Sequence, residues 1–310
     1  MRPQIAILPY RRAFRSPLRT AHGLWTERKG FIVRMEDSGR VGYGEVAPIP
    51  GFGTETVEEA GAFLTEWSRN PNVAIPRELP CCAFGLSAAL AMDTRKRVPP
   101  VAALLPAGAD ALEVLSQKAA KGFTSFKWKI GVEPLATELA LFTELIDQLP
   151  DGGSLRLDAN GGIDVEELMK WIDAILPHLP KVEYLEQPLP VGQETRMAEV
   201  MRTSGVAIAL DESLNGGAGD SLLREWKGPL VIKPALMGDM GALAHRLQSV
   251  AERVVLSSVF ETGVGFANAM ALAERLPDIQ RAIGFDTCDV FDDDLDLAPE
   301  TVWKQLAHLT

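Results

Sequence analysis

The stretch Gly122 to Ile130 (GFTSFKWKI) decides the fold, because it is a short apolar run that carries two lysines near its end. Five similar runs follow it along the chain: Ser154 to Asn160 (SLRLDAN), Val182 to Leu189 (VEYLEQPL), Val206 to Ser213 (VAIALDES), Pro229 to Ala235 (PLVIKPA) and Arg253 to Ser258 (RVVLSS). Gly, Pro, Asp or Asn bound these runs, which is typical of strands. Each run therefore predicts one short, buried strand.

Helical patterns separate these predicted strands. Apolar residues recur at three- and four-residue steps over residues 135–149, 165–176, 196–203, 240–251 and 265–276. Strict alternation of strand and helix predicts a parallel sheet, and enough repeats close such a sheet into a barrel. We therefore predict an α/β fold of the TIM type.

Ionisable residues stand near the ends of these strands, at intervals of 22 to 29 residues from the second lysine onward. They are Lys127, Lys129, Asp158, Glu186, Asp211 and Lys233. In a β/α barrel all strands deliver their C-terminal ends to one face, so these side chains are expected to share one pocket.

The parity of the side chains supports this convergence. Lys127 and Lys129 share one face of their strand, as Arg156 and Asp158 share one face of theirs. An arginine inside a barrel needs a carboxylate partner, which Asp158 or a neighbouring acid could supply. Taken alone, Lys-Trp-Lys would fit a half-exposed strand, but the other four residues favour the inward orientation.

Composition limits the classes of function. The chain has 310 residues, 46% of them apolar, and a net charge of −11. The acidic balance makes nucleic acid an unfavourable partner. The sequence contains no stretch of about 20 apolar residues and no signal-peptide pattern, so we expect no membrane segment and a cytoplasmic location.

Several smaller features indicate ordinary structure and no functional site. The pairs and runs of like charge, Arg11-Arg12 and Asp292 to Asp294, are predicted to be solvated. The three cysteines, Cys81, Cys82 and Cys288, are predicted to be reduced thiols.

Residues 1–97 have a different pattern and predict an α+β domain that precedes a barrel over residues 98–290. A hairpin is expected from Gly30 to Val46, followed by helices over residues 56–68 and 83–97. Two segments, 15–29 and 48–54, read as loops that could fold over a ligand.

The predicted pocket favours one kind of chemistry. Three carboxylates without histidine or thiolate form a hard oxygen site suited to Mg²⁺, with Asp158, Glu186 and Asp211 as the ligands. A lysine beside a divalent cation and another lysine loses part of its proton affinity and can act as a base. The combination predicts removal of a proton next to a carboxylate, with the cation stabilising the enediolate.

These motifs resemble those of the enolase superfamily, muconate-lactonising-enzyme subgroup. The resemblance rests on Lys-x-Lys at 127–129, Asp-x-Asn at 158–160, Glu-Gln-Pro at 186–188, Asp-Glu-Ser at 211–213 and Ile-Lys-Pro at 232–234. Within the subgroup the chain is most similar to the o-succinylbenzoate synthase family, on the segments 233–238, 256–262 and 284–287.

The resemblance implies a modified (β/α)7β barrel with an α+β capping domain, to which the C-terminal segment 291–310 returns. It implies Mg²⁺, or Mn²⁺ in its place, and a small-molecule carboxylate substrate. The implied reaction is dehydration of 2-succinyl-6-hydroxy-2,4-cyclohexadiene-1-carboxylate to 2-succinylbenzoate, a step of menaquinone or phylloquinone biosynthesis.

The resemblance also implies roles for individual residues. Lys129 would be the base, Lys127 would tune it, and Lys233 would remain an ammonium. Asn160 would lie next to the metal ligands without binding the metal, and Arg156 would be an inward-facing charge partner. Ser258, Gly263 and Gly265 would contact substrate, the two glycines through amides at a helix N-terminus.

Two alternatives stay open at this point. The first is a racemase of N-acylamino acids or an epimerase of dipeptides on the same scaffold. Such epimerases usually show Asp-x-Asp after the last strand, whereas this chain has Asp286-Thr287-Cys288-Asp289. The second is a binding protein that kept the fold without catalysis, which would not require all the acids and lysines.

Overall fold

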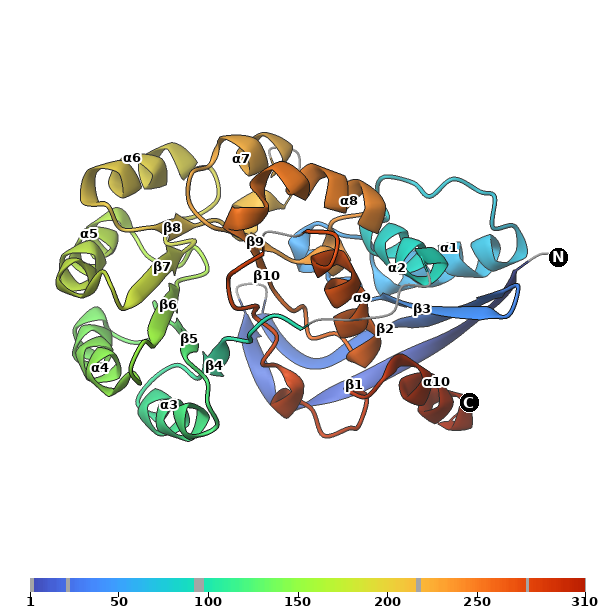
Figure 1. Cartoon of the computed structure of the whole chain (residues 1–310), viewed down its shortest axis with the longest axis horizontal. Coiled ribbons are helices and arrows are strands. Elements are labelled where there is room, and N and C mark those ends of the chain that lie inside the picture. The colour runs from blue at the N-terminus through green and yellow to red at the C-terminus, as the bar shows by residue number, and fades with distance from the viewer. Residues whose placement is uncertain (1–2, 21–22, 92–97, 216–218, 277–278, 310) are drawn as a thin grey trace.

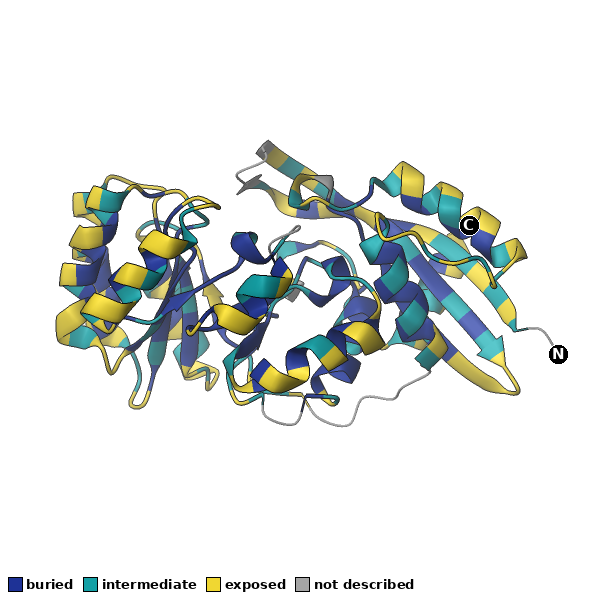
Figure 2. Ribbon diagram, turned by 90° about the horizontal axis from the view of Figure 1, so that it is seen from above, coloured by how far each residue is buried: buried dark blue, intermediate teal, exposed yellow. Residues whose placement is uncertain are grey.

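The computed structural model describes residues 3–20, 23–91, 98–215, 219–276 and 279–309. A barrel and a smaller α+β domain lie side by side, with helices α3 to α6 at one end of the elongated molecule and the long strands of the other domain at the opposite end (Figure 1). Buried residues are concentrated on the strands and on the inward sides of the helices (Figure 2). None of the described helices is long and apolar enough to cross a membrane.

The barrel sheet is parallel and closes on itself. A five-stranded section contains β4 (Ala103–Leu105), β5 (Ser125–Lys129), β6 (Ser154–Asp158), β7 (Val182–Glu186) and β8 (Ile208–Ala209), and a two-stranded section contains β9 (Leu230–Ile232) and β10 (Val254–Leu256). Parallel bridges join Leu210 to Leu230, Ser257 to Gly284 and Ile283 to Val101. The segment at Ile283 and Gly284 is therefore the eighth strand, next to β4.

A helix follows each strand from β4 to β10. These helices are α3 (Asp110–Ala120), α4 (Leu135–Gln148), α5 (Val165–Ile175), α6 (Glu194–Ser204), α7 (Gly219–Glu225), α8 (Met240–Leu247) and α9 (Gly263–Ala273). Local signals fix several ends: Asp164 and Glu167 form a capping box before α5, and Gly205 ends α6 with a φ of 77°. The described part of the barrel thus has the predicted (β/α)7β order.

All six predicted strands and all five predicted barrel helices are present, with ends shifted by a few residues. The pattern missed β4, α3, α7 and the eighth strand. The missed strands are three residues long or are held only by isolated bridges, so they are too short for an alternating pattern to stand out. Short 3₁₀ turns occupy 50–52, 176–178, 212–214, 234–236, 248–253 and 288–290, and the fifth of these replaces the end of the predicted helix over 240–251.

The capping domain is an antiparallel sheet covered by two helices. Its strands are β1 (Gln4–Thr20), β2 (Gly23–Asp37) and β3 (Arg40–Val46), and its helices are α1 (Val57–Arg69) and α2 (Pro80–Ala91). Gly44 of β3 lies so close to α2 that a Cβ there would sit 1.8 Å from the carbonyl oxygen of Gly85. The predicted continuation of α2 over residues 92–97 lies outside the described residues.

The predicted loop over residues 15–29 is wrong. Arg15 to Thr20 and Gly23 to Lys29 continue β1 and β2, and Leu18 pairs with Trp25 across a register shift. Residues 21–22 lie outside the described part. The polar composition suggested a loop, but ladder hydrogen bonds of a long two-stranded ribbon extend the strands.

The C-terminal helix α10 (Pro299–Leu309) packs on the cap, where Val302 and Leu306 join Tyr10 and Ile32 in one apolar cluster. The predicted solvation of the two charged segments is wrong for Arg12 and in part for Asp293, whereas Arg11, Asp292 and Asp294 are exposed as predicted. Arg12 is fully buried, and it donates to Asp293 at 2.8 Å and to Asp296 at 3.0 Å. The interaction ties β1 to the segment that follows the barrel. Cys81 and Cys82 are free thiols, as predicted, and the side chain of Cys288 lies outside the described part.

Candidate active site

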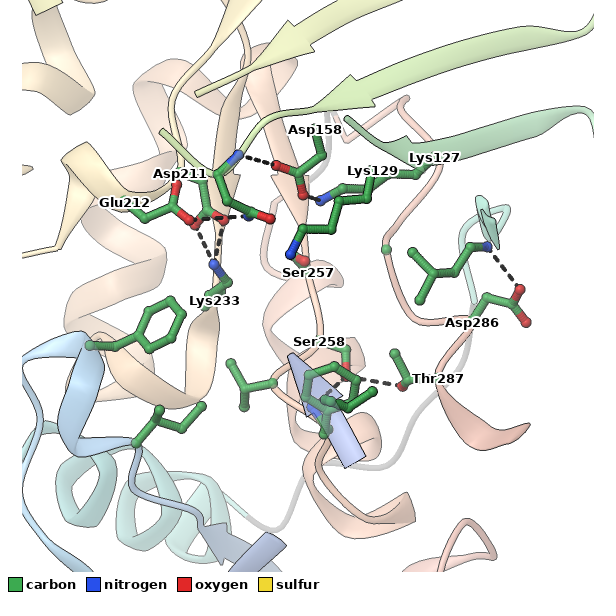
Figure 3. A pocket seen from close by; sticks show the side chains of 18 of the residues that line it. Lys127, Lys129, Asp158, Asp211, Glu212, Lys233, Ser257, Ser258, Asp286 and Thr287 are labelled. Carbon is green, nitrogen blue, oxygen red and sulfur yellow. Dashed lines mark hydrogen bonds and ion pairs between the residues drawn. The ribbon is translucent and has the colours of Figure 1, made fainter. Parts of the chain in front are cut away.

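A pocket of about 300 Å³ lies where the C-terminal ends of the barrel strands face the cap. Lys127, Lys129, Asp158, Asp211 and Lys233 line it from the barrel (Figure 3). The cap contributes the apolar side chains Leu18, Trp25, Ile49 and Phe52. The pocket is therefore polar on the barrel side and apolar on the cap side, as a site that excludes water would be.

Strand register brings the acids and lysines together. Lys129 of β5 is paired with Asp158 of β6, and Asp158 is paired with Glu186 of β7. Lys127 Nζ lies 2.8 Å from Asp158 Oδ2 and 2.8 Å from Glu186 Oε1. Lys233, at the end of β9, forms an ion pair with Asp211, which follows β8. The structure thus brings all six predicted residues to one end of the barrel.

The charges of this cluster shift its pKa values. Burial, and then the neighbouring Asp158 carboxylate, raise the pKa of Glu186 to about 8. Burial would lower the pKa of Lys127, but Asp158 and Glu186 outweigh it and raise that pKa. Lys233 behaves in the same way, because Asp211 and Glu212 outweigh the effect of burial. Both lysine pKa values are thus raised, whereas a neighbouring divalent cation would lower them. The reason is that the groups nearest to both lysines are carboxylates.

The donor set fits a hard cation. Glu186 is fully buried, and its Oε2 has no hydrogen-bond partner. Among the described residues, no three carboxylate, imidazole or thiol side chains converge closely enough to enclose one ion. Instead, the ammonium of Lys127 lies between Asp158 and Glu186, and the ammonium of Lys233 is paired with Asp211. A cation at Asp158, Glu186 and Asp211 would therefore have to displace these lysines from the carboxylates.

The third lysine has a different environment. No hydrogen bond or ion pair of Lys129 is present within the described part of the chain, and its ammonium points into the pocket near Ser257 (Figure 3). In the barrel ring β5 is the second strand and β9 the sixth, so Lys129 and Lys233 face the pocket from opposite sides. The ring of Phe52 lies 4.8 Å from Lys233 Nζ and covers that lysine from the cap.

Two further residues of the quoted motifs belong to the site. Glu212 lines the pocket, and burial followed by repulsion from Asp211 raises its pKa to about 7. Gln187 is fully buried and its Oε1 accepts the backbone amides of Asp211 and Ser213 at 3.1 and 3.2 Å. Gln187 thus fixes the position of Asp211. Both residues could have been found from the sequence, because they belong to the motifs Glu-Gln-Pro and Asp-Glu-Ser.

The two predicted supporting residues lie in different places, because Asn160 lines the pocket and Arg156 does not. Asn160 follows β6 with a φ of 46°, and its Nδ2 donates to Glu212 Oε1 at 3.2 Å. Arg156 is buried in the middle of β6 and donates to Glu183 Oε2 at 2.7 Å. Its carboxylate partner is therefore a neighbouring acid on β7 and not Asp158.

The predicted substrate contacts separate into two groups. Ser258 lines the pocket, where its Oγ donates to Glu261 and lies 3.1 Å from Thr287 Oγ1. Gly263 and Gly265 do not line this pocket. The amide of Gly263 donates to Leu295 O at 2.7 Å, and that of Gly265 donates to Glu45 Oε2 at 2.9 Å.

The N-terminus of α9 is therefore satisfied from within the chain. Glu45 of β3 also accepts the Thr262 amide at 3.0 Å and the Tyr10 hydroxyl at 2.6 Å. A buried carboxylate of the cap thus takes the place at which an anionic substrate group was expected. The sequence could not show this, because Glu45 and Gly265 are more than two hundred residues apart.

Comparisons with known proteins agree with this geometry. Residues 110–219 match the family described as Enolase C-terminal domain-like, and residues 4–92 match the family described as MenC, N-terminal domain. The o-succinylbenzoate synthase of Thermosynechococcus vestitus is 39% identical over 269 residues, which are 82% of this chain and 84% of that protein. The enzyme of the same name from Vibrio cholerae is 31% identical over 90% of this chain and 86% of its own length.

Solved structures extend the match to the whole fold. The crystal structure of o-succinylbenzoate synthase from Thermosynechococcus elongatus, complexed with Mg in the active site, has a TM-score of 0.87 and 35% identity, and covers 100% of both chains. The L-Ala-D/L-Glu epimerase of Bacillus subtilis shares the fold at a TM-score of 0.77 and 20% identity, over 94% of this chain and 91% of that one.

A closed (β/α)7β barrel, its cap and the converging acids and lysines define a barrel enzyme whose site lies at the ends of the strands. The fold class predicted from the sequence is confirmed. The chain belongs to the o-succinylbenzoate synthase family of the enolase superfamily.

Proposed function

We propose that this protein dehydrates 2-succinyl-6-hydroxy-2,4-cyclohexadiene-1-carboxylate to 2-succinylbenzoate, in menaquinone or phylloquinone biosynthesis. The observation that carries the proposal is the pair of lysines on opposite sides of one pocket, beside three carboxylates, in a member of this family. The substrate carries two carboxylates and its product contains an aromatic ring, which suits a pocket with cations on one side and apolar side chains on the other.

Lys129 is the proposed base. It has no carboxylate partner in the described part of the chain and points into the pocket, so its amine is available to a substrate proton. Neutral Lys129 would take the proton next to the substrate carboxylate, and the resulting ammonium would return that proton to the departing hydroxyl. The carbon–hydrogen and carbon–oxygen bonds break on the same face, and water leaves.

Lys233 and Lys127 have different proposed roles. The Asp211 pair and the ring of Phe52 hold Lys233 as an ammonium opposite Lys129. There it would stabilise the negative charge that develops on the substrate. Lys127, between Asp158 and Glu186 and two residues from Lys129, would tune the base electrostatically.

Asp158, Glu186 and Asp211 are the proposed ligands of Mg²⁺. When bound, the ion would act as a Lewis acid on the substrate carboxylate and stabilise the enediolate charge. Gln187 and Asn160 would keep the ligand-bearing loops in place. Mn²⁺ in place of Mg²⁺, the domain boundaries at residues 97 and 290 and the cytoplasmic location stay predictions.

Direct assay of the purified protein tests the proposal. With Mg²⁺ we expect conversion of the cyclohexadiene carboxylate, followed by the absorbance of the aromatic product. The matched competitor is an N-succinylamino acid in D₂O. α-Proton exchange from this compound that is faster than the dehydration would replace the proposal by the racemase alternative.

The lysine variants distinguish the two reactions further. Racemisation needs proton transfer from both faces, whereas syn-dehydration needs it from one. Arginine preserves the charge but is too basic to shuttle protons. We therefore expect Lys233→Arg to retain more dehydratase activity than Lys129→Arg, and equal loss in both would contradict the assigned roles.

A further inference from the structure

The wall of the pocket away from Lys233 contains a carboxylate that the proposed mechanism does not use. Asp286 follows the eighth strand and lines the pocket beside Thr287, on the side opposite Lys233 and Asp211 (Figure 3). Its side chain is 14% exposed, and Asp286 Oδ2 accepts the Leu104 amide at 3.0 Å.

A lysine outside the pocket neutralises this carboxylate. Lys118, in the last turn of α3, places Nζ 2.8 Å from Asp286 Oδ1, and its side chain is also 14% exposed. Asp289 lies at 3.4 Å from the same ammonium but is 82% exposed, so solvent screens that interaction. Lys118 is thus a partly buried partner of Asp286 and is not among the residues that line the pocket.

The distribution of charge makes this pair important for ligand choice. The cations that line the described pocket are Lys127, Lys129 and Lys233, all on barrel strands or at their ends. A dicarboxylic ligand with one carboxylate at that end must place its second charge near another part of the wall. The same pocket is lined by the hydroxyl-bearing residues Ser258 and Thr287, whose Oγ and Oγ1 atoms lie 3.1 Å apart. An unpaired Asp286 would repel an anion at this position.

We propose that Lys118 is a specificity-determining positioning residue, which cancels the charge of Asp286 so that the outer wall tolerates the second carboxylate of a dianionic ligand. An unpaired Asp286 would instead favour a ligand that carries an ammonium group. The inference rests on the proposed function for the identity of the dianion. It adds a determinant of substrate class that lies outside the site itself.

The test is a charge cycle at the two positions, read out by calorimetric binding of 2-succinylbenzoate to the Mg²⁺-loaded protein. Lys118→Met leaves the wall negative and should weaken binding about tenfold or more, by juxtaposing like charges. Asp286→Asn keeps an acceptor for the Leu104 amide and should bind at least as tightly as the unmodified protein. The double variant restores a neutral wall and should bind within about threefold of the unmodified protein.

A purely structural role predicts a different order. If the pair only holds α3 to the barrel rim, all three variants should lose affinity, and the double variant should not recover it. The loss in Lys118→Met should also shrink as salt is raised, because the repulsion is screened. Lys121→Met is the matched control, since it removes the same charge from an exposed position and should leave affinity unchanged.

Failure of the proposed function and failure of the inference about Lys118 give different results. If the unmodified protein neither turns over the cyclohexadiene carboxylate nor binds 2-succinylbenzoate, the proposed function fails. If it does both and Lys118→Met binds the product as tightly, the inference about Lys118 fails alone. Recovery in the double variant, with no effect of Lys121→Met, would support it.

Discussion

The barrel holds a buried cluster of charges at each end, and the two clusters have opposite balances. At the C-terminal end the acids Asp158, Glu186 and Asp211 share the ammonium groups of Lys127 and Lys233. At the N-terminal end one acid, Glu183, is shared by two arginines: Arg156 Nε lies 2.7 Å and Arg281 Nη1 2.6 Å from its oxygens. Among the groups that form ion pairs, one end has a surplus of acids and the other a surplus of cations.

The pKa values of the two glutamates show the consequence. Burial raises the pKa of both, but Asp158 adds to this effect at Glu186 and takes its pKa to about 8. At Glu183 the two arginines outweigh burial, and the pKa lies below its ordinary value. The cluster at the N-terminal end, the lower cluster, therefore keeps Glu183 ionised, although Arg156 Nη2 and Arg281 Nε have no hydrogen-bond partner. The cluster at the C-terminal end, the upper cluster, has a carboxylate oxygen without a partner, Glu186 Oε2, and its negative charge can be balanced by a cation.

Removal of the unpaired lysine tests the upper cluster most severely. Lys129→Ala should lower kcat by about 10³-fold or more, because it removes the proposed general base. Circular dichroism and Mg²⁺ affinity should stay close to those of the unmodified protein, since no carboxylate depends on this lysine. Lys170→Ala, at an exposed helical position, is the control. Turnover above a tenth of normal in Lys129→Ala would remove the base from this position.

The next effect is on cation binding. Glu186→Gln should weaken Mg²⁺ about 100-fold or more, because it removes one of three anionic ligands. Titration of the protein with Mn²⁺, followed by electron paramagnetic resonance and by competition with Mg²⁺, measures this without reference to activity. Glu183→Gln at the other end should leave the affinity unchanged. Equal affinity in Glu186→Gln and the unmodified protein would contradict the ligand assignment.

The same two substitutions should affect the free energy of unfolding in the opposite order, with the larger effect at Glu183. Without divalent cation, Glu183→Gln should reduce the free energy of unfolding by about 3 kcal/mol, because it leaves two arginines without an anion at a largely buried position. Glu186→Gln should change it by less than about 1 kcal/mol, because Lys127 keeps Asp158 as its partner. Urea unfolding in the presence of a chelator gives both values. A larger loss at Glu186 than at Glu183 would mean that the upper cluster is balanced without a cation.

A third buried acid, near the pocket, sharpens the comparison through pH. Burial, assisted by Glu45, raises the pKa of Glu261 to about 7. A carboxyl with a raised folded-state pKa stabilises the fold fully below its unfolded pKa of about 4.5, and this contribution is lost as pH rises through 7. Glu261→Gln should therefore gain about 3 kcal/mol relative to the unmodified protein between pH 4.5 and 7.5. Parallel pH profiles of urea unfolding for the two proteins would contradict this.

The functional residues near the C-terminal ends of the strands could be predicted from the sequence. The ion pairs between charged side chains could not. The six apolar runs and their terminal residues follow a local rule, because a parallel barrel needs a buried strand and a covering helix in each unit. Glu183 shows why the pairs escape such a rule. A register shift between Leu155 and Arg156 pairs these residues with Val182 and Tyr184, so Glu183 lies at an irregularity that no alternating pattern encodes.

The sequence by itself determined six strands and five helices of the barrel, the family, and the six acids and lysines that meet at one end of the barrel. Their spacing suffices, because every strand of such a barrel ends on the same face. Only the tertiary structure decided which charges neutralise one another: Arg12 with Asp293, Lys118 with Asp286, and Glu45 with the N-terminus of α9. These partners are distant in sequence, and ion pairing depends on the distance in space that the closed barrel and its cap create.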